Sequence, residues 1–295
     1  MARDLPIRRG VPPVCGTPVD LPPASRQRRV RYLQADGSAG AGTGPDTGID
    51  AFWGIAAEVP VEIGLNGRPW TVMMATPADL EDFATGIAVT EGLLADPRAI
   101  QGIAMVARDR GIALDLQVDP AALAALPARS LEGRTGCGLC GLERLSQLAA
   151  PQAGAAPPAL PDLAAVARAF AALEAAQPLN RATRSVHGAA FCAPDGAIRL
   201  VREDVGRHNA LDKLLGALLR GGLDPAAGFV AMTSRCSFEL VQKAARVRVP
   251  LLATVSAPTG LALEVAARAG LTLVARGPQG TLVAFDPDEG APDAR

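Results

Sequence analysis

Apolar and polar residues alternate along the first patterned part of the chain, which predicts β-strands there. Every second residue from Val59 to Leu65 is apolar, the period of a strand with one buried face. The Asn66-Gly67 pair that follows is a strong hairpin signal, so a return strand is expected. A second alternating pair of runs predicts another hairpin. The expected strands cover 59–65, 70–74, 103–106 and 112–118.

Between these hairpins the apolar period changes to that of a helix. From Leu80 to Ala88 apolar residues recur every three or four positions, which places them on one helical face. Thr76 is expected as the N-cap, with Pro77 at the first helical position. The hairpins and the helix together predict a small α+β domain over residues 48–135.

The second half of the chain alternates short apolar strands with helices. A hairpin around Asp195-Gly196 comes first, and near-continuous apolar strands separated by helical segments follow. Such alternation predicts a mostly parallel, three-layer α/β domain, here over residues 162–288. The strands are expected over 185–192, 197–203, 228–233, 250–255, 271–275 and 281–285, and the helices over 206–220, 236–247 and 259–269.

The remaining segments lack a sustained apolar period. Residues 1–47 are predicted to be a flexible tail, 136–161 a loop, short helix and linker, and 289–295 a second tail. With a net charge of −1 and 3% aromatic residues, nucleic acid is not an expected partner. No apolar run is long enough for a membrane span and no signal segment is evident. Five scattered cysteines do not make a disulfide framework, so a soluble, cytoplasmic protein is expected.

Polar residues follow the predicted strands of the second half, where open α/β sheets bind their ligands. Ser or Thr opens two of the helices there, and free N–H groups with nearby arginines suit a phosphate-bearing ligand. Neither a G-x-x-x-x-G-K-[ST] loop nor a G-x-G-x-x-G turn is present. We call the four loops at residues 204–209, 233–237, 256–260 and 276–280 the polar edge. Its candidate ligand-binding residues are Arg207, His208, Ser234, Arg235, Ser256 and Thr259.

Two histidines stand near this edge. His208 and Asp212 are four residues apart on a predicted helix and could pair with each other. His187 lies in an apolar strand and is expected to be a core residue rather than a ligand. The two lysines of the chain, Lys213 and Lys243, fall in the same region, a weak hint that a particular side chain is needed there.

The segment Gly136-Cys137-Gly138-Leu139-Cys140-Gly141 carries the most reactive pattern of the chain. A C-x-x-C pair can hold a metal, form a redox disulfide or carry sulfur. A structural zinc site needs two more ligands, and no second pair exists. No apolar strand precedes the pair as in thioredoxin-like proteins. An incidental pair is also conceivable, while glycines on both sides suit a mobile sulfur carrier. We expect no metal site.

Five stretches resemble the FdhD family, the formate dehydrogenase accessory sulfurtransferases, and the resemblance runs from about Ala57 to Phe285. The matching stretches are Glu58–Glu62, Gly136–Gly141, Arg202–Lys213, Ser237–Ala245 and Val255–Thr259. The resemblance implies a second domain like that of cytidine deaminases, although the chain has no H-x-E and no P-C-x-x-C motif. It also implies a homodimer.

The function implied by the resemblance is sulfur transfer. A cysteine desulfurase would supply sulfur as a persulfide on Cys137, with Cys140 assisting. The acceptor would be the molybdenum or tungsten bis-pterin guanine dinucleotide cofactor (Mo-bis(molybdopterin guanine dinucleotide)) needed by formate dehydrogenase. The family's cofactor-contacting segment corresponds to Ala275, Arg276, Gly277, Pro278, Gln279 and Gly280.

The chain departs from the family pattern in places. The loop after Val274 is one residue short, and Ala275 stands where an aromatic residue is often found. Cys236 is interpreted as a buried neighbour of the site. Two alternatives stay open: a chaperone that binds the cofactor without covalent sulfur chemistry, and a nucleotide-binding thiol redox protein.

Overall fold

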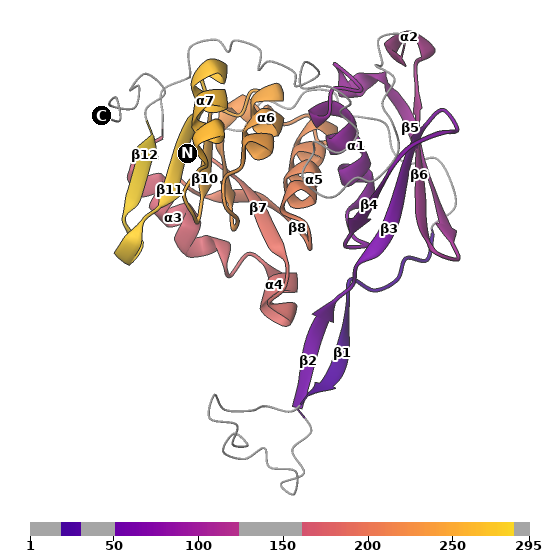
Figure 1. Cartoon of the computed structure of the whole chain (residues 1–295), viewed down its shortest axis with the longest axis horizontal. Helices are drawn as coiled ribbons and strands as arrows, with labels where there is room; N and C mark the ends of the chain where they lie inside the picture. Colours follow the sequence, from indigo (N-terminus) through magenta and orange to yellow (C-terminus); the bar gives the residue numbers. More distant parts are fainter. Residues whose placement is uncertain (1–18, 31–50, 124–160, 286–295) are drawn as a thin grey trace, which may run out of the picture.

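The computed structural model describes residues 19–30, 51–123 and 161–285, and contains three β-sheets (Figure 1). A ribbon of two strands, β1 (Ser25–Val30) and β2 (Ala51–Ala56), extends away from the rest of the molecule. The prediction that residues 1–47 form a flexible tail is therefore wrong for Ser25–Val30, which pairs antiparallel with β2. Of the predicted domain boundaries, residues 48, 135 and 288 fall outside the described ranges, and all four boundaries stay predictions.

A four-stranded sheet follows in the order β4-β3-β6-β5. Its strands confirm the two predicted hairpins, and the first turn has positive φ at Asn66 and Gly67, 50° and 75°. Helix α1 (Leu80–Thr90) covers one face of this sheet. The strands are β3 (Val59–Leu65), β4 (Arg68–Ala75), β5 (Ile100–Arg108) and β6 (Gly111–Val118), and short helices occupy Pro97–Ala99 (η1) and Pro120–Leu123 (α2).

Helix α1 begins later than predicted. Its first residue is Leu80, and the N-cap is Asp79 in a left-handed conformation, φ 53°, without a side-chain cap. Thr76 is instead fully buried, and its backbone N–H donates to the Asp204 carboxylate at 2.9 Å. A tertiary contact has thus replaced the local cap that the sequence pattern predicted.

The second half of the chain builds a six-stranded sheet in the order β12-β11-β10-β9-β7-β8. The prediction of a mostly parallel sheet is wrong. Strands β9, β10 and β11 are parallel neighbours, but β7, β8 and β12 join antiparallel. The strands are β7 (His187–Cys192), β8 (Ile198–Asp204), β9 (Phe229–Met232), β10 (Leu251–Thr254), β11 (Thr272–Arg276) and β12 (Leu282–Phe285).

Helices cover both faces of this sheet, which gives the three layers that were predicted. Along β7 the side chains alternate: Ala189 and Phe191 join the core beneath α5, α6 and α7, and Ala190 and Cys192 join the core beneath α3. The helices are α3 (Leu163–Leu173), α4 (Pro178–Thr183), α5 (Arg207–Arg220), α6 (Phe238–Arg246) and α7 (Gly260–Ala269), with short turns at Pro225–Ala227 (η3) and Pro278–Gly280 (η4).

The two larger sheets are joined by the packing of α1 against α5. Gly86 lies against the Asp212 carbonyl and Gly216 against the Asp82 carbonyl, so the helix backbones approach closely. The earlier residue of α1, Asp82, meets the later residue of α5, Gly216. The two helices therefore run antiparallel where they cross. One apolar cluster continues from the four-stranded sheet through both helices into the six-stranded sheet. The described ranges contain no helix with both the length and the apolar character that crossing a bilayer requires.

Candidate functional site

The polar edge forms where four strands of the large sheet end. Strands β9, β10 and β11 are parallel, and β8 points the same way because it and β9 each pair antiparallel with β7. The loops that follow these four strands therefore lie along one edge, and β7 starts there with His187. The loops after β9 and β10 also touch: the Thr259 N–H donates to the Cys236 carbonyl at 3.1 Å. The structure thus brings the predicted loops together.

The candidate binding residues at this edge differ in exposure. Arg235, Thr259, Arg276, Pro278, Gln279 and Gly280 are exposed, Arg207, Ser256 and Gly277 are half-buried, and Ser234, His208 and Ala275 are buried. Ala275 belongs to β11, with its side chain in the sheet. The Thr259 hydroxyl accepts a hydrogen bond from the Ala262 N–H at 3.3 Å and caps α7. The accessible cations of the edge are therefore the two exposed arginines and Arg207.

Two helix N-termini face the same edge without side-chain caps. The N-cap of α5 is Gly206, which has no side chain, and the N-cap of α6 is Ser237, whose hydroxyl accepts no hydrogen bond from the helix. The first-turn N–H groups of a helix attract anions when no side chain satisfies them. The Nε of Arg207 is in addition buried, with no hydrogen-bond partner among the described residues. These donors suit an anionic group bound between the loops.

His208 does not pair with Asp212, so that prediction is wrong. Its Nε2 lies 3.0 Å from the Glu239 Oε2, and the Ser237 hydroxyl donates to the same oxygen at 2.9 Å. His208 and Glu239 are both buried, each at 7% exposure. The side chains at the starts of α5 and α6 are thus linked by a carboxylate that sequence spacing did not reveal.

Asp204 organises the loop after β8. Its carboxylate accepts hydrogen bonds from the Gly206 N–H at 2.8 Å and the Asn209 side chain at 3.0 Å, besides the Thr76 N–H. The Lys213 ammonium lies 2.7 Å away, and both charged side chains are fully buried. A buried charge needs such complete pairing to be tolerated. Asp204 and Lys213 therefore fix the turn that presents Arg207 and His208, and the rarity of lysine was the only sequence signal for this role.

A second buried ionic group ties α1, α5 and α6 together. The Lys243 ammonium contacts the Asp212 Oδ2 at 2.9 Å and the Glu91 Oε1 at 2.7 Å. Burial alone would lower the pKa of Lys243, but the two carboxylates outweigh it and hold this pKa above its usual range. Burial likewise raises the pKa of the Asp212 carboxyl, against the pull of Lys243. Both lysines of the chain are thus structural ions beneath the polar edge.

The two cysteines of the C-x-x-C motif, Cys137 and Cys140, lie outside the described residues. Cys192 and Cys236 are free and buried, and burial raises the pKa of each thiol to about 12. Because the thiolate is the nucleophile, burial disfavours reaction at both sulfurs near neutral pH. In the described part of the chain no cluster of three or more His, Cys, Asp or Glu side chains could hold a metal ion.

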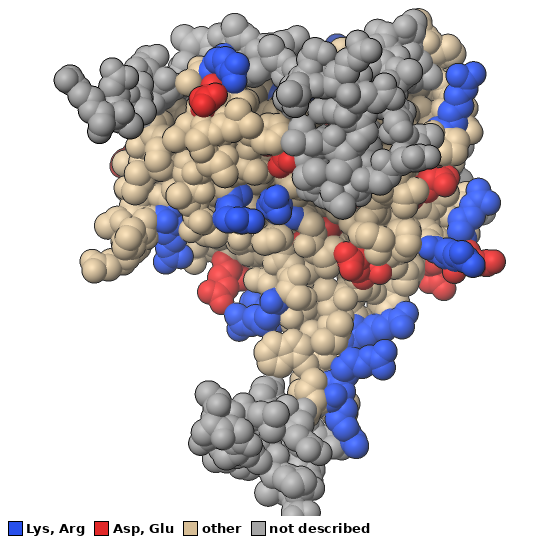
Figure 2. All heavy atoms as spheres, in the orientation of Figure 1, with Lys and Arg blue, Asp and Glu red and all other residues tan. Residues whose placement is uncertain are grey.

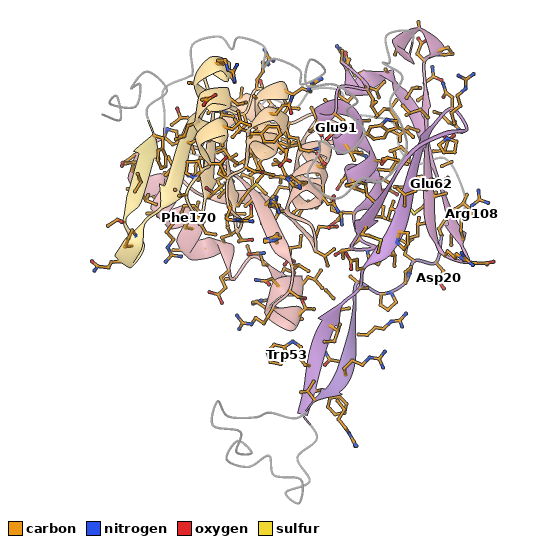
Figure 3. All side chains as sticks on the ribbon, in the orientation of Figure 1. Asp20, Trp53, Glu62, Glu91, Arg108 and Phe170 are labelled. Atoms are coloured by element: carbon orange, nitrogen blue, oxygen red, sulfur yellow. The ribbon has the colours of Figure 1, made fainter. Side chains whose placement is uncertain are left out.

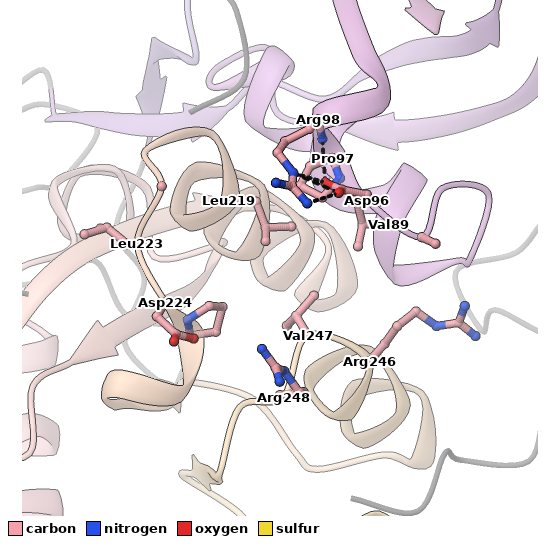
Figure 4. A pocket seen from close by; sticks show the side chains of 13 residues that line it. Val89, Asp96, Pro97, Arg98, Leu219, Leu223, Asp224, Arg246, Val247 and Arg248 are labelled. Atoms are coloured by element: carbon pink, nitrogen blue, oxygen red, sulfur yellow. Dashed lines mark hydrogen bonds and ion pairs between the residues drawn. The ribbon is translucent and has the colours of Figure 1, made fainter. Parts of the chain in front are cut away.

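A cavity of about 380 Å³ lies away from the polar edge, beside the C-terminal ends of α5 and α6 (Figure 4). Its charged lining includes Arg98, which the Asp96 carboxylate holds through two guanidinium nitrogens. Arg246 lies in the last turn of α6 and Arg248 follows the helix, where positive charge complements the helix dipole. The cavity is therefore separate from the site described above.

His187 is half-buried at the start of β7, and this location gives a pH prediction. Desolvation lowers its pKa, with Arg207 and His208 adding to the effect and Thr233 and Asp204 opposing it. The folded protein therefore favours neutral His187, and stability is lost as the pH falls from about 6.5 through the lowered pKa. We expect an NMR titration of the His187 ring to give a pKa below 6.5, and His187→Asn to flatten the acid loss of stability. Equal acid losses in both proteins would contradict this.

The described residues form an α/β protein with three sheets and a polar edge whose donors suit an anion, and comparison gives its family. The chain belongs to the FdhD/NarQ family, whose model matches residues 56–289. A sulfur carrier protein FdhD from Xanthomonas campestris is 47% identical over 222 residues, 75% of this chain and 79% of that protein. One from Variovorax paradoxus is 50% identical over 221 residues, 74% of this chain and 80% of that protein.

A solved structure shares the fold. A protein from Desulfotalea psychrophila, described as a formate dehydrogenase accessory protein, superposes with a TM-score of 0.68 at 25% sequence identity. The superposition covers 90% of this chain and 99% of that chain.

Proposed function

We propose that this protein is a sulfur carrier that activates formate dehydrogenase. Relatives at 47% and 50% identity carry the name sulfur carrier protein FdhD, and this is the observation that carries the proposal. A cysteine desulfurase is the proposed donor and the molybdenum or tungsten bis-pterin guanine dinucleotide cofactor the proposed acceptor. We further propose a cytoplasmic homodimer, and a cytidine deaminase-like fold for the six-stranded domain.

The proposed chemistry begins at Cys137. Its thiolate attacks the outer sulfur of the donor's cysteine persulfide, a sulfur–sulfur bond forms on Cys137, and the donor's cysteine leaves as a thiolate. Only when the acceptor is bound does Cys140 attack the inner sulfur of the Cys137 persulfide, which releases the outer sulfur as hydrosulfide and leaves a Cys137–Cys140 disulfide. Oxidation of the two cysteines to the disulfide supplies the two electrons that reduce the outer sulfur to hydrosulfide. A dithiol reductant then returns both cysteines to thiols.

The polar edge supports a dinucleotide cofactor as the acceptor. Exposed Arg235 and Arg276, the unpartnered Nε of Arg207 and two uncapped helix N-termini are donors for phosphate oxygens. Gly277 and Gly280 let the backbone after β11 turn closely, with φ 81° at Gly280. In this proposal the edge binds and orients the cofactor while sulfur is delivered.

Mass spectrometry of the intact protein tests the carrier directly. After incubation with a cysteine desulfurase and cysteine, the wild-type chain is expected to gain the mass of one sulfur atom, and Cys137→Ala is not. Cys236→Ala is the matched control and should gain one sulfur atom like the wild type. Burial raises the pKa of the Cys236 thiol to about 12, so this thiol should not carry sulfur. Absence of any gain in the wild type, or an equal gain in Cys137→Ala, would overturn the proposal.

A further inference from the structure

The ribbon of β1 and β2, here called the arm, is an unusual feature of this molecule (Figure 1). A two-stranded ribbon alone is marginally stable in water. The described contacts between the arm and the six-stranded domain are with α4, where Gly54 lies against the Ala182 carbonyl and the Trp53 Nε1 donates to the Thr183 carbonyl at 3.3 Å. Gly54 and Trp53 therefore hold the arm against α4.

One face of the arm combines positive charge with exposed apolar surface. Arg26 pairs with Ile55 and Arg28 with Trp53 across the two strands, and directly opposed residues project from the same face. Ile55 is 46% exposed and Trp53 37%. No acidic residue occurs in either strand, and Figure 2 shows basic side chains stacked along the ribbon. Arginine and tryptophan in such a patch are typical of the central residues of protein interfaces.

The four-stranded sheet has one face that α1 does not cover. Cross-strand pairing places Val72, Glu62, Ala113 and Val106 in one row across this face. Val72 is 51% exposed and Val106 46%, and Met74 on the same face is 46% exposed. Glu62 is exposed within this apolar row (Figure 3). Strand alternation places Arg108 beside Val106 and Asp115 beside Ala113 on the same face. We call these seven residues the open face, and such a patch on a sheet indicates a binding surface.

The two surfaces match in chemistry, since each offers apolar area and the basic arm would meet an open face with two carboxylates, Glu62 and Asp115, and one base, Arg108. We propose that the arm of one copy docks on the open face of a second copy, with Arg26 and Arg28 against Glu62. A two-fold axis makes the contact reciprocal, so each copy gives one arm and receives one. The net charge of −1 gives no general attraction to polyanions, whereas the acidic apolar partner surface is present on this chain. The inference names the interface of the homodimer proposed above and does not depend on sulfur transfer.

Charge reversal in the full chain tests this contact by sedimentation at a series of concentrations. Arg28→Glu and Glu62→Arg are each expected to weaken dimerisation at least about tenfold, because each places like charges opposite one another twice per dimer. The controls are Arg199→Glu and Glu264→Arg, which reverse exposed charges elsewhere and should leave the dimer unchanged. Thermal melting of each variant checks that it is folded.

Mixing the two weakened variants gives the decisive result. In a mixed dimer of Arg28→Glu with Glu62→Arg, both reciprocal contacts again join opposite charges, so the mixture should dimerise like the wild type. A monomeric wild-type chain overturns the proposal, and so does a dimer that neither variant weakens. Weakened variants that fail to associate on mixing overturn it as well. These outcomes leave the proposed sulfur transfer standing, since the mass gain at Cys137 tests it separately.

Discussion

Replacing Gly216 by alanine is expected to lower the free energy of unfolding by about 3 kcal/mol or more, although alanine is the better helix former. A Cβ at Gly216 would stand 1.8 Å from the Asp82 carbonyl oxygen, and one at Gly86 would stand 1.8 Å from the Asp212 carbonyl oxygen. Both obstacles are backbone atoms, so no side chain can rotate away. The helices α1 and α5 would have to separate, and the apolar cluster that they share would open.

Urea unfolding of Gly216→Ala and Gly86→Ala measures this effect, and Gly260→Ala is the matched control. Gly260 also lies in a helix, but its added Cβ would meet nothing within 4 Å. That variant should be as stable as the wild type or gain up to about 1 kcal/mol from helix propensity. If Gly216→Ala unfolded at the same urea concentration as Gly260→Ala, the close helix contact would be contradicted.

Apolar alternation and turn residues correctly predicted the elements whose structure depends on neighbouring residues in the sequence. The alternation from Val59 to Leu65 became β3 because its apolar residues face α1, and Asn66-Gly67 formed the expected turn because both residues tolerate positive φ. The arm escaped prediction because both its faces are largely exposed, so β1 shows no alternation to read. Strand direction in the large sheet also escaped, since the pairing of β7 with β9 depends on topology and not on composition.

In the candidate site too, features set by local sequence were predicted, and features set by distant contacts were not. Its loops were predicted because strands that point the same way end at the same edge of a sheet. The partner of His208 was not predicted, because Glu239 lies 31 residues away in the sequence. Asp212, four residues after His208, was the partner that helical spacing suggested. Asp204 and Thr76 are separated by 128 residues, a contact that no pattern within either segment encodes. The chemistry of Cys137 rests on sequence and on family membership.

The ionic group at Lys243 makes the other large prediction. Its ammonium contacts Asp212, Glu91 and the Thr90 hydroxyl, and the Asp212 side chain is only 1% exposed. Lys243→Met keeps the length of the side chain but leaves two carboxylates facing each other without a cation. Removing one partner of a buried ion pair costs about 3–5 kcal/mol, so we expect urea unfolding to show a loss of that size.

A double variant separates stranded charge from lost packing. Lys243→Met with Asp212→Leu removes the buried carboxylate together with its cation, and only Glu91, whose side chain is 17% exposed, is left to turn toward solvent. The double variant should therefore be more stable than Lys243→Met alone. Arg98→Met is the exposed control, because its ion pair with Asp96 is solvated and should contribute little. Equal losses in the single and double variants would mean that the lysine stem, and not its charge, holds α6 against α1 and α5.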